Sequence, residues 1–186
     1  MKMERLTCAA LAGSLCLMMP VASLAQLPPA ATLLPPGFTL ETERSFGPAT
    51  MISAVKANEK VPKPHQDNKI RLSIGSNGMP GAEERVEMMA DGPEDPARKV
   101  PGSVTRDEPC GKQRYRGGLL TCRKSITPWV GSGNAPDLIM LTVNWVVATP
   151  TGLVNIGVSN FVGAKATAVG WIDDIADKII PNDKKD

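Results

Sequence analysis

Residues 138–180 read LIMLTVNWVVATPTGLVNIGVSNFVGAKATAVGWIDDIADKII and carry the clearest structural signal in the chain. Apolar residues alternate along Leu138–Ala148 and again along Leu153–Val162, which is typical of two half-buried strands. The intervening Thr149-Pro150-Thr151-Gly152 has proline and glycine where a tight turn favours them. The first part of this stretch therefore predicts a β-hairpin.

The turn also predicts the register of this hairpin. With Pro150 and Thr151 as the loop, Ala148 lies opposite Leu153. Apolar residues then meet across one face in the pairs Val147/Val154, Trp145/Ile156, Val143/Val158 and Ile139/Val162. Because the turn and the alternation agree, we expect the strands to pair in this register.

The apolar spacing becomes helical from about Ala164 to Ile180. One stripe contains Ala164, Ala168, Trp171, Ile172, Ile175 and Ile179. Pro181 follows and is expected to end the helix. We expect this helix to pack on the apolar face of the sheet.

The N-terminal residues 1–25 have the features of a cleavable signal peptide. A short basic start precedes the largely apolar Leu6–Met19, and small residues at Ser23 and Ala25 suit a cleavage that leaves Gln26 first. The apolar run is shorter than the roughly 20 residues that span a bilayer. The sequence therefore predicts a periplasmic or secreted protein without a transmembrane segment in the mature chain.

Two cysteines, Cys110 and Cys122, remain after cleavage. In an oxidising compartment such a pair most simply forms one disulfide. Their spacing is not the C-x-x-C of a redox pair, so we expect the bond to be structural.

The charge of the mature chain is nearly balanced. Of 21 basic and 19 acidic residues, Lys2, Arg5 and Glu4 lie in the signal peptide, which leaves 19 and 18. A balanced charge gives no long-range attraction to nucleic acid or to an anionic membrane. The three Trp, one Tyr and three Phe show no interleaving with basic residues of the kind that binds single strands. We expect no nucleic-acid partner.

The mature chain has the length of one domain. We expect a proline-rich segment over 26–37, one α+β domain over 38–180 and a charged tail over 181–186. Within the domain, 91–111 contains four prolines and few apolar residues, which indicates a long flexible loop or a binding loop.

Further strands are expected before the final hairpin. The candidates are Phe38–Arg44, Thr50–Ala57 (strand or short helix), Ile70–Ile74, Glu83–Ala90, and a hairpin over Lys112–Ile126 that turns at Gly117-Gly118. The predicted fold is α+β, an antiparallel meandering sheet of about five to seven strands with the C-terminal helix on one face. In this layout the chain resembles the PsbP-like sandwiches of small secreted accessory proteins, and a shared layout leaves function open.

A basic ladder is the strongest candidate for a binding surface. It comprises Lys112, Arg114, Arg116 and Arg123, which the predicted hairpin places on one face. Like charges on adjacent strands repel, so the ladder suits an acidic protein or a polyanion as partner. Alternatively, Glu83, Glu84 and Glu87 of the preceding predicted strand neutralise it within the sheet, which is the interpretation we favour because the net charge is near zero.

A second candidate surface is the polar side of the final hairpin, with Thr142, Asn144, Asn155, Gly157 and Ser159. These small polar residues suit a shallow ligand platform. They also suit the ordinary wet face of a sheet that a helix covers on one side only, which is the interpretation we favour.

The residues available for catalysis are few. His65 is the only histidine, so a hydrolase would need it as the base beside Asp67, and no G-x-S-x-G elbow is present. One histidine and two bridged cysteines cannot make a zinc set. A copper site of His65 with Met79, Met88 and Met89 is less favoured than methionines that fill a core. We expect no cofactor and no metal.

These observations favour a secreted or periplasmic, non-catalytic accessory or binding protein. The alternatives are a small secreted hydrolase that uses His65 and a purely structural component of the cell envelope.

Overall fold

The computed structural model describes residues 27–58, 69–94, 98–99, 102, 104–128, 137–161 and 163–180. The elements in chain order are α1 (Ala30–Leu33), β1 (Thr39–Phe46), β2 (Ala49–Ala57), β3 (Lys69–Asn77), α2 (Ala82–Asp91), β4 (Arg98–Lys99), β5 (Arg106–Tyr115), β6 (Gly118–Thr127), β7 (Leu138–Thr149), β8 (Gly152–Phe161) and α3 (Lys165–Ile179). The predicted signal peptide, His65 and the tail 181–186 lie outside the described residues.

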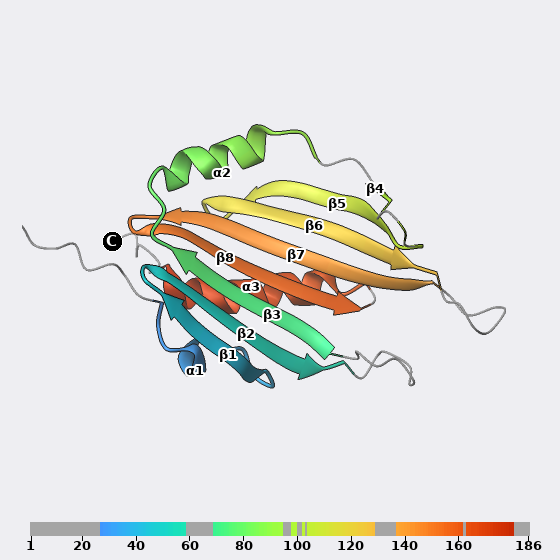
Figure 1. The fold of residues 1–186 in the computed structure, drawn as a ribbon, viewed down its shortest axis with the longest axis horizontal. Coiled ribbons are helices and arrows are strands. Elements are labelled where there is room, and N and C mark those ends of the chain that lie inside the picture. The colour runs from blue at the N-terminus through green and yellow to red at the C-terminus, as the bar shows by residue number, and fades with distance from the viewer. Residues whose placement is uncertain are drawn as a thin grey trace, which may run out of the picture.

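The strands form one antiparallel sheet in the order β1-β2-β3-β8-β7-β6-β5-β4 (Figure 1). This α+β architecture with a C-terminal helix agrees with the prediction, although the sheet has eight strands, one of which is the two-residue β4. It is not a single meander. Two meanders, β1–β3 and β4–β8, meet where β3 pairs with β8. In this pairing Leu72 and Ile74 of β3 lie opposite Val158 and Ile156 of β8.

The register predicted for the β7–β8 hairpin is confirmed. Ala148 pairs with Leu153, and the next rungs are Val147↔Val154, Trp145↔Ile156 and Val143↔Val158. The remaining predicted pair involves Val162, which lies outside the described residues. Turn residues and alternation are local signals, and here no longer-range contact competes with them.

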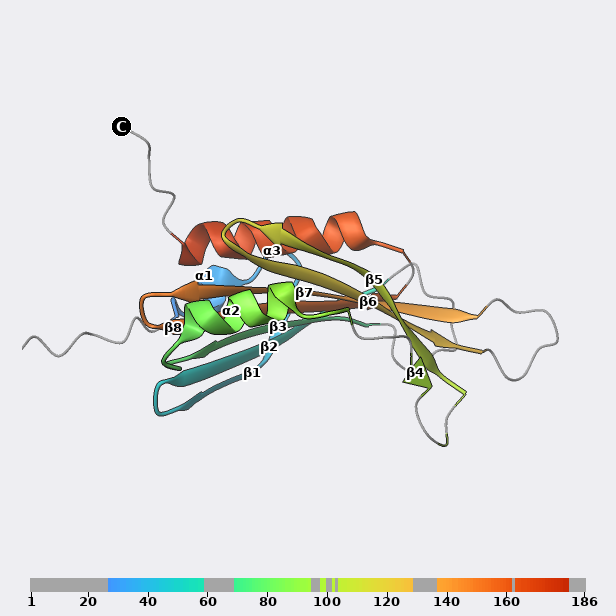
Figure 2. The same ribbon diagram turned by 90° about the horizontal axis from the view of Figure 1, so that it is seen from above.

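The main core lies between the sheet and α3. Trp145, Ile156, Val143 and Val158 are fully buried, and they share one cluster with four residues of α3: Ala168, Ile172, Ile175 and Ala176. The Trp145 indole Nε1 donates a hydrogen bond to the carbonyl oxygen of Tyr115 (2.9 Å). Figure 2 shows α1 and α3 on the same side of the sheet.

Helix α2 replaces the strand expected over Glu83–Ala90, so that prediction is wrong. Ala82 and Val86 are the buried residues of α2, and their spacing of four is helical. Val86 packs on Leu119 and Val146. Val146 is the sequence neighbour of Trp145, which packs with α3. Because neighbouring side chains in a strand point to opposite faces of the sheet, α2 lies on the face opposite α3 (Figure 2). The expectation of a helix on one side only is therefore also wrong.

The β5–β6 hairpin turns one residue earlier than predicted. Tyr115 pairs with Gly118, and Arg116 and Gly117 have φ of 51° and 75°, as the two central residues of a type I′ turn require. Gly118 serves a different purpose. A Cβ there would lie 2.2 Å from the carbonyl oxygen of Val146, so the glycine permits β6 to approach β7.

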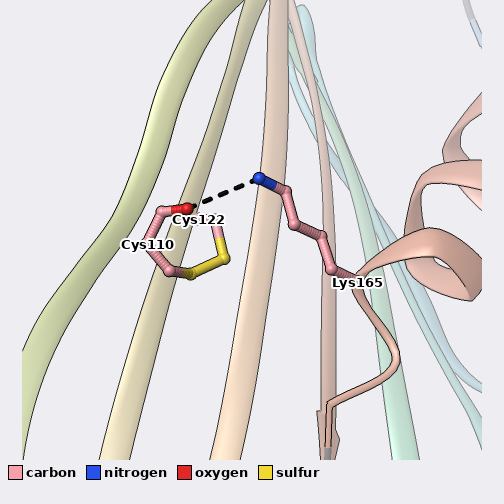
Figure 3. The surroundings of a disulfide bond; sticks show 3 residues. All are labelled: Cys110, Cys122 and Lys165. Carbon is pink, nitrogen blue, oxygen red and sulfur yellow. Dashed lines mark hydrogen bonds between the residues drawn. A yellow bond between two sulfur atoms is a disulfide. The ribbon is translucent and has the colours of Figure 1, made fainter.

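The predicted disulfide Cys110–Cys122 is present. It joins β5 to β6 at a β-bulge between Pro109 and Gly111, and Lys165 at the start of α3 donates to the Cys110 carbonyl oxygen (3.4 Å) (Figure 3). Arg106–Gly111, expected within the long loop, is therefore part of a strand.

Candidate functional site

The predicted basic ladder divides between the two faces of the sheet. Lys112, Arg114 and Arg123 lie on the α2 side, since Lys112 pairs with Thr121 and Arg114 with Leu119. Arg116 occupies the turn and reaches α3 on the other side. The four residues therefore do not form one patch, because the turn begins one residue earlier than its two glycines suggest.

Arg116 belongs to a cluster that fastens the hairpin turn to α3. Its Nη1 donates to Oδ1 of Asp173 (3.1 Å), and its Nη2 pairs with Asp177. The hydroxyl of Tyr115 donates to both carboxylate oxygens of Asp173 (2.7 Å each). The hydrogen bond to Asp173, and then burial, raise the pKa of Tyr115. The hydrogen bond to Asp177 is the largest cause that raises the pKa of Arg116. These side chains satisfy one another, and we assign them a structural role.

Lys112 and Arg114 hold α2 against the sheet. The Lys112 ammonium donates to the carbonyl oxygens of Met89 (3.2 Å) and Gly92, at the C-terminal end of α2 where carbonyls lack helical partners. Arg114 pairs with Glu87 of α2. Internal neutralisation, the alternative considered from the sequence, is therefore present for Arg114, although the acidic residue comes from a helix rather than a strand.

A cleft of about 470 Å³ opens between the C-terminal end of α2 and the sheet. Its apolar lining includes Met88, Met89, Pro93, Pro109 and Leu119. Its polar and charged lining comprises Lys112, Thr121, Arg123, Thr142, Asn144 and Glu94. Hydrogen-bonding groups of the sheet thus face the side chains of a helix terminus across the cleft.

The pairing of β6 with β7 determines which residues lie side by side on the polar floor of the cleft. Thr121 lies opposite Asn144, and Arg123 lies opposite Thr142. The hydroxyls of Thr142 and Ser159 lie 3.1 Å apart and share a hydrogen bond. These positions contain part of the predicted polar platform and one residue of the basic ladder. The sequence identified both sets separately but could not join them, because α2, which walls the cleft, was predicted as a strand.

Gly157 leaves room for two polar side chains on the neighbouring part of this face. A Cβ at Gly157 would lie 2.7 Å from both Oδ1 of Asn144 and Oγ of Ser73. The two side chains therefore converge above a position that only glycine leaves open. Asn144 consequently belongs both to the cleft and to the polar platform that continues across β8 and β3.

Two other hollows offer less to a ligand. One, of about 520 Å³, lies between the start of α2 and the β7–β8 turn and is lined mainly by turn residues with Glu83 and Glu84. Another, of about 350 Å³, lies beside Lys56 and Trp171. There the buried Asn58 donates to Asn160 (3.0 Å), so these polar groups already bond each other.

Within the described ranges, no group of three or more His, Cys, Asp or Glu side chains could hold a metal ion. In the same part of the chain, no helix has the length and apolar character needed to cross a bilayer.

Comparison with known proteins gave no match to a family model, a curated protein or a solved structure.

Proposed function

We propose that this chain is a non-catalytic binding protein of the periplasm or the extracellular space, and that the cleft beneath the end of α2 is its binding site. The observation that supports this most is the convergence of Arg123, Thr142 and Asn144 beside the exposed Met88 and Met89. Ligand sites commonly combine a few placed polar groups with apolar lining in a volume of this order. Methionine suits such a site because its side chain adapts to varied shapes.

The compartment is inferred from two independent features. Residues 1–25 have the pattern of a signal peptide, and Cys110 and Cys122 form a disulfide, a bond that persists mainly outside the reducing cytosol.

The sequence predicts an acidic partner for the basic ladder, and we place the binding of such a partner in the cleft. Lys112 and Arg114 hold α2, and Arg116 holds α3. Lys112 and Arg123 are the members of the ladder that line the cleft. An acidic group of a partner would therefore be recognised in the cleft rather than along a row of four parallel cations.

A matched pair of variants tests this site. Thr142→Trp places an indole in the cleft, whereas Ser159→Trp removes the same hydroxyl–hydroxyl hydrogen bond from the residue directly opposite, which does not line the cleft. The wild type and each variant are purified in the folded state from the compartment into which they are exported, so that a bound molecule stays in place. Native mass spectrometry and identification of co-purifying proteins then show what it carries.

We expect the wild type and Ser159→Trp to carry the same bound species, and Thr142→Trp to lose it. Thermal unfolding of each variant confirms that both are folded. The proposal is wrong if Thr142→Trp keeps the species that the wild type carries, or if the wild type carries none that depends on this face.

A further inference from the structure

We infer that the Cys110–Cys122 disulfide is a redox device that fixes the pairing register of the first half of β5, and with it the β5 wall of the cleft. The wall is complete only while the bond is intact. The consequence of this coupling for binding rests on the proposed function of the cleft.

The β-bulge at Cys110 decides which face of the sheet the first half of β5 presents. Pro109 pairs with Arg123 and Gly111 pairs with Cys122, so Cys110 is the extra residue of β5. Side chains alternate between the two faces of a strand, and one extra residue reverses the alternation beyond it. Pro109 therefore lies on the α2 side, where it lines the cleft with Arg123. A continuous ladder would turn Pro109 toward α3.

The disulfide can form only in the bulged register. Cys122 belongs to the core on the α3 side, and Cys110 packs against the same core. Figure 3 shows both beside Lys165 at the start of α3. In a continuous ladder Cys110 would pair with Arg123 and point to the α2 side, and two cysteines that point to opposite faces cannot be bridged. The bond therefore excludes the slipped register.

In the reduced protein the native register would depend on polar contacts that a slip can replace. Ser125 donates to Asp107, and the hydroxyls of Thr105 and Thr127 lie 3.0 Å apart. The two-residue β4 pairs with this half of β5 at the edge of the sheet and would move with it. A continuous ladder would also restore the pairing that the bulge interrupts. We therefore expect both registers to be populated once the bond is reduced.

Thiol–disulfide exchange sets the state of the bond. During oxidation the thiols of Cys110 and Cys122 give up two protons and two electrons, and a small disulfide takes them up and leaves as two thiols. A dithiol reverses the exchange and becomes a cyclic disulfide itself. In a reducing cytosol the cysteines stay as thiols, and in an oxidising compartment the bond forms. Binding in the cleft is thereby confined to the exported, oxidised protein.

NMR spectroscopy of the mature protein, oxidised or reduced with dithiothreitol, reads the register directly. The native register places Asp107 opposite Ser125, whereas a slip by one residue places Asp107 opposite Ile126. We expect the first set of cross-strand proton contacts alone in the oxidised protein and both sets in the reduced protein. Relative to β7, amide exchange of residues 106–108 should become at least about tenfold faster on reduction.

Two cysteine-free variants separate the register from general stability. Cys110→Ala/Cys122→Ala keeps the extra residue and should behave like the reduced protein. Deletion of Cys110 combined with Cys122→Ala removes the extra residue, so Pro109 stays opposite Arg123 in a ladder without a bulge. This variant should keep the native contact of Asp107 with Ser125, with or without dithiothreitol. Both variants lack the bond, so the loss of the cross-link itself affects them equally.

Three results would overturn the coupling. They are a reduced protein that keeps the native contacts alone, a deletion variant that slips as the Cys110→Ala/Cys122→Ala protein does, and global unfolding of both variants. In the last case the bond would stabilise the whole fold rather than one register.

The same samples distinguish this coupling from the proposed function. We expect reduction to release the species that the wild type carries, and retention of that species would show that the β5 wall is not needed for binding. If the register responds to reduction but Thr142→Trp loses no bound species, the binding site is wrong and the coupling stands. If Thr142→Trp loses the species and reduction leaves the register unchanged, the coupling is wrong and the binding site stands.

Discussion

At the scale of single residues, Tyr115 is the most accessible reporter of the cluster that joins the β5–β6 turn to α3. It is the only tyrosine of the chain, so absorbance near 295 nm follows its ionisation alone. Its hydroxyl donates to Asp173, and ionisation would place two anions side by side. The pKa of Tyr115 is therefore raised above 10.0.

We predict that Tyr115 titrates above its ordinary range in the folded protein and near pH 10 in urea. Because folding raises this pKa, the stability that Tyr115 contributes is complete below about pH 10 and is lost as pH rises through the folded value. Asp173→Asn should lower the folded midpoint. An unchanged midpoint in Asp173→Asn would contradict the hydrogen bond.

We predict opposite responses to alanine substitution at two glycines. Gly118→Ala forces a Cβ against the backbone of β7 and should lower the free energy of unfolding by about 1–3 kcal/mol. Gly170→Ala, in α3 with open space around it, should raise it by about 0.5–1 kcal/mol through helix propensity. Urea denaturation of both variants measures the difference. A Gly118→Ala variant that is as stable as the wild type would show that Gly118 is not required for the close approach.

Gly118 also shows where the prediction from sequence failed. Gly117 and Gly118 form a pair that favours a turn, and sequence alone cannot show that Gly118 is needed against β7. Shifting the turn by one residue moved Arg116 from the basic ladder to α3. By contrast, the disulfide was predictable, because only two cysteines remain after the predicted cleavage.

At the scale of elements, the final hairpin and α3 were predictable, whereas α2 was not. Strand alternation, turn residues and a helical stripe are local and mutually consistent between Leu138 and Ile180. The α2 segment has two buried apolar residues, Ala82 and Val86, and residues four apart share a face in a strand as well as in a helix. Its helical state is stabilised by contacts from β5, β6 and β7, which no local sequence pattern records.

We predict that Lys112→Met loosens α2 from its C-terminal end. The substitution removes the ammonium that bonds the carbonyl oxygens of Met89 and Gly92, a loss of about 1 kcal/mol in local opening, or roughly fivefold faster amide exchange. Hydrogen exchange of Ala82–Asp91 measures it. Arg114→Met is the control, because its ion pair with Glu87 is solvent-exposed and should contribute less. Exchange in α2 that does not change in Lys112→Met would disprove the role of Lys112.

At the scale of the whole molecule, the cleft is assembled from four separate parts of the chain: α2 with the residues after it, β5, β6 and β7. Each part looks ordinary in sequence, and their polar and apolar residues become a candidate site only when α2 lies across the sheet. The function class could therefore be ranked from the sequence, but the position of the site could not.

The pairing of β3 with β8 also bears on how the chain folds. The inner edge of β3 pairs only with residues 153–159, which lie 76 to 88 positions further along the chain than their partners in β3. Until those residues are available, the N-terminal ribbon β1–β3 presents an open edge, and contacts between such distant segments form slowly. The native sheet can therefore close only after residues 153–159 have been synthesised. This late closure would suit the export that the pattern of residues 1–25 predicts.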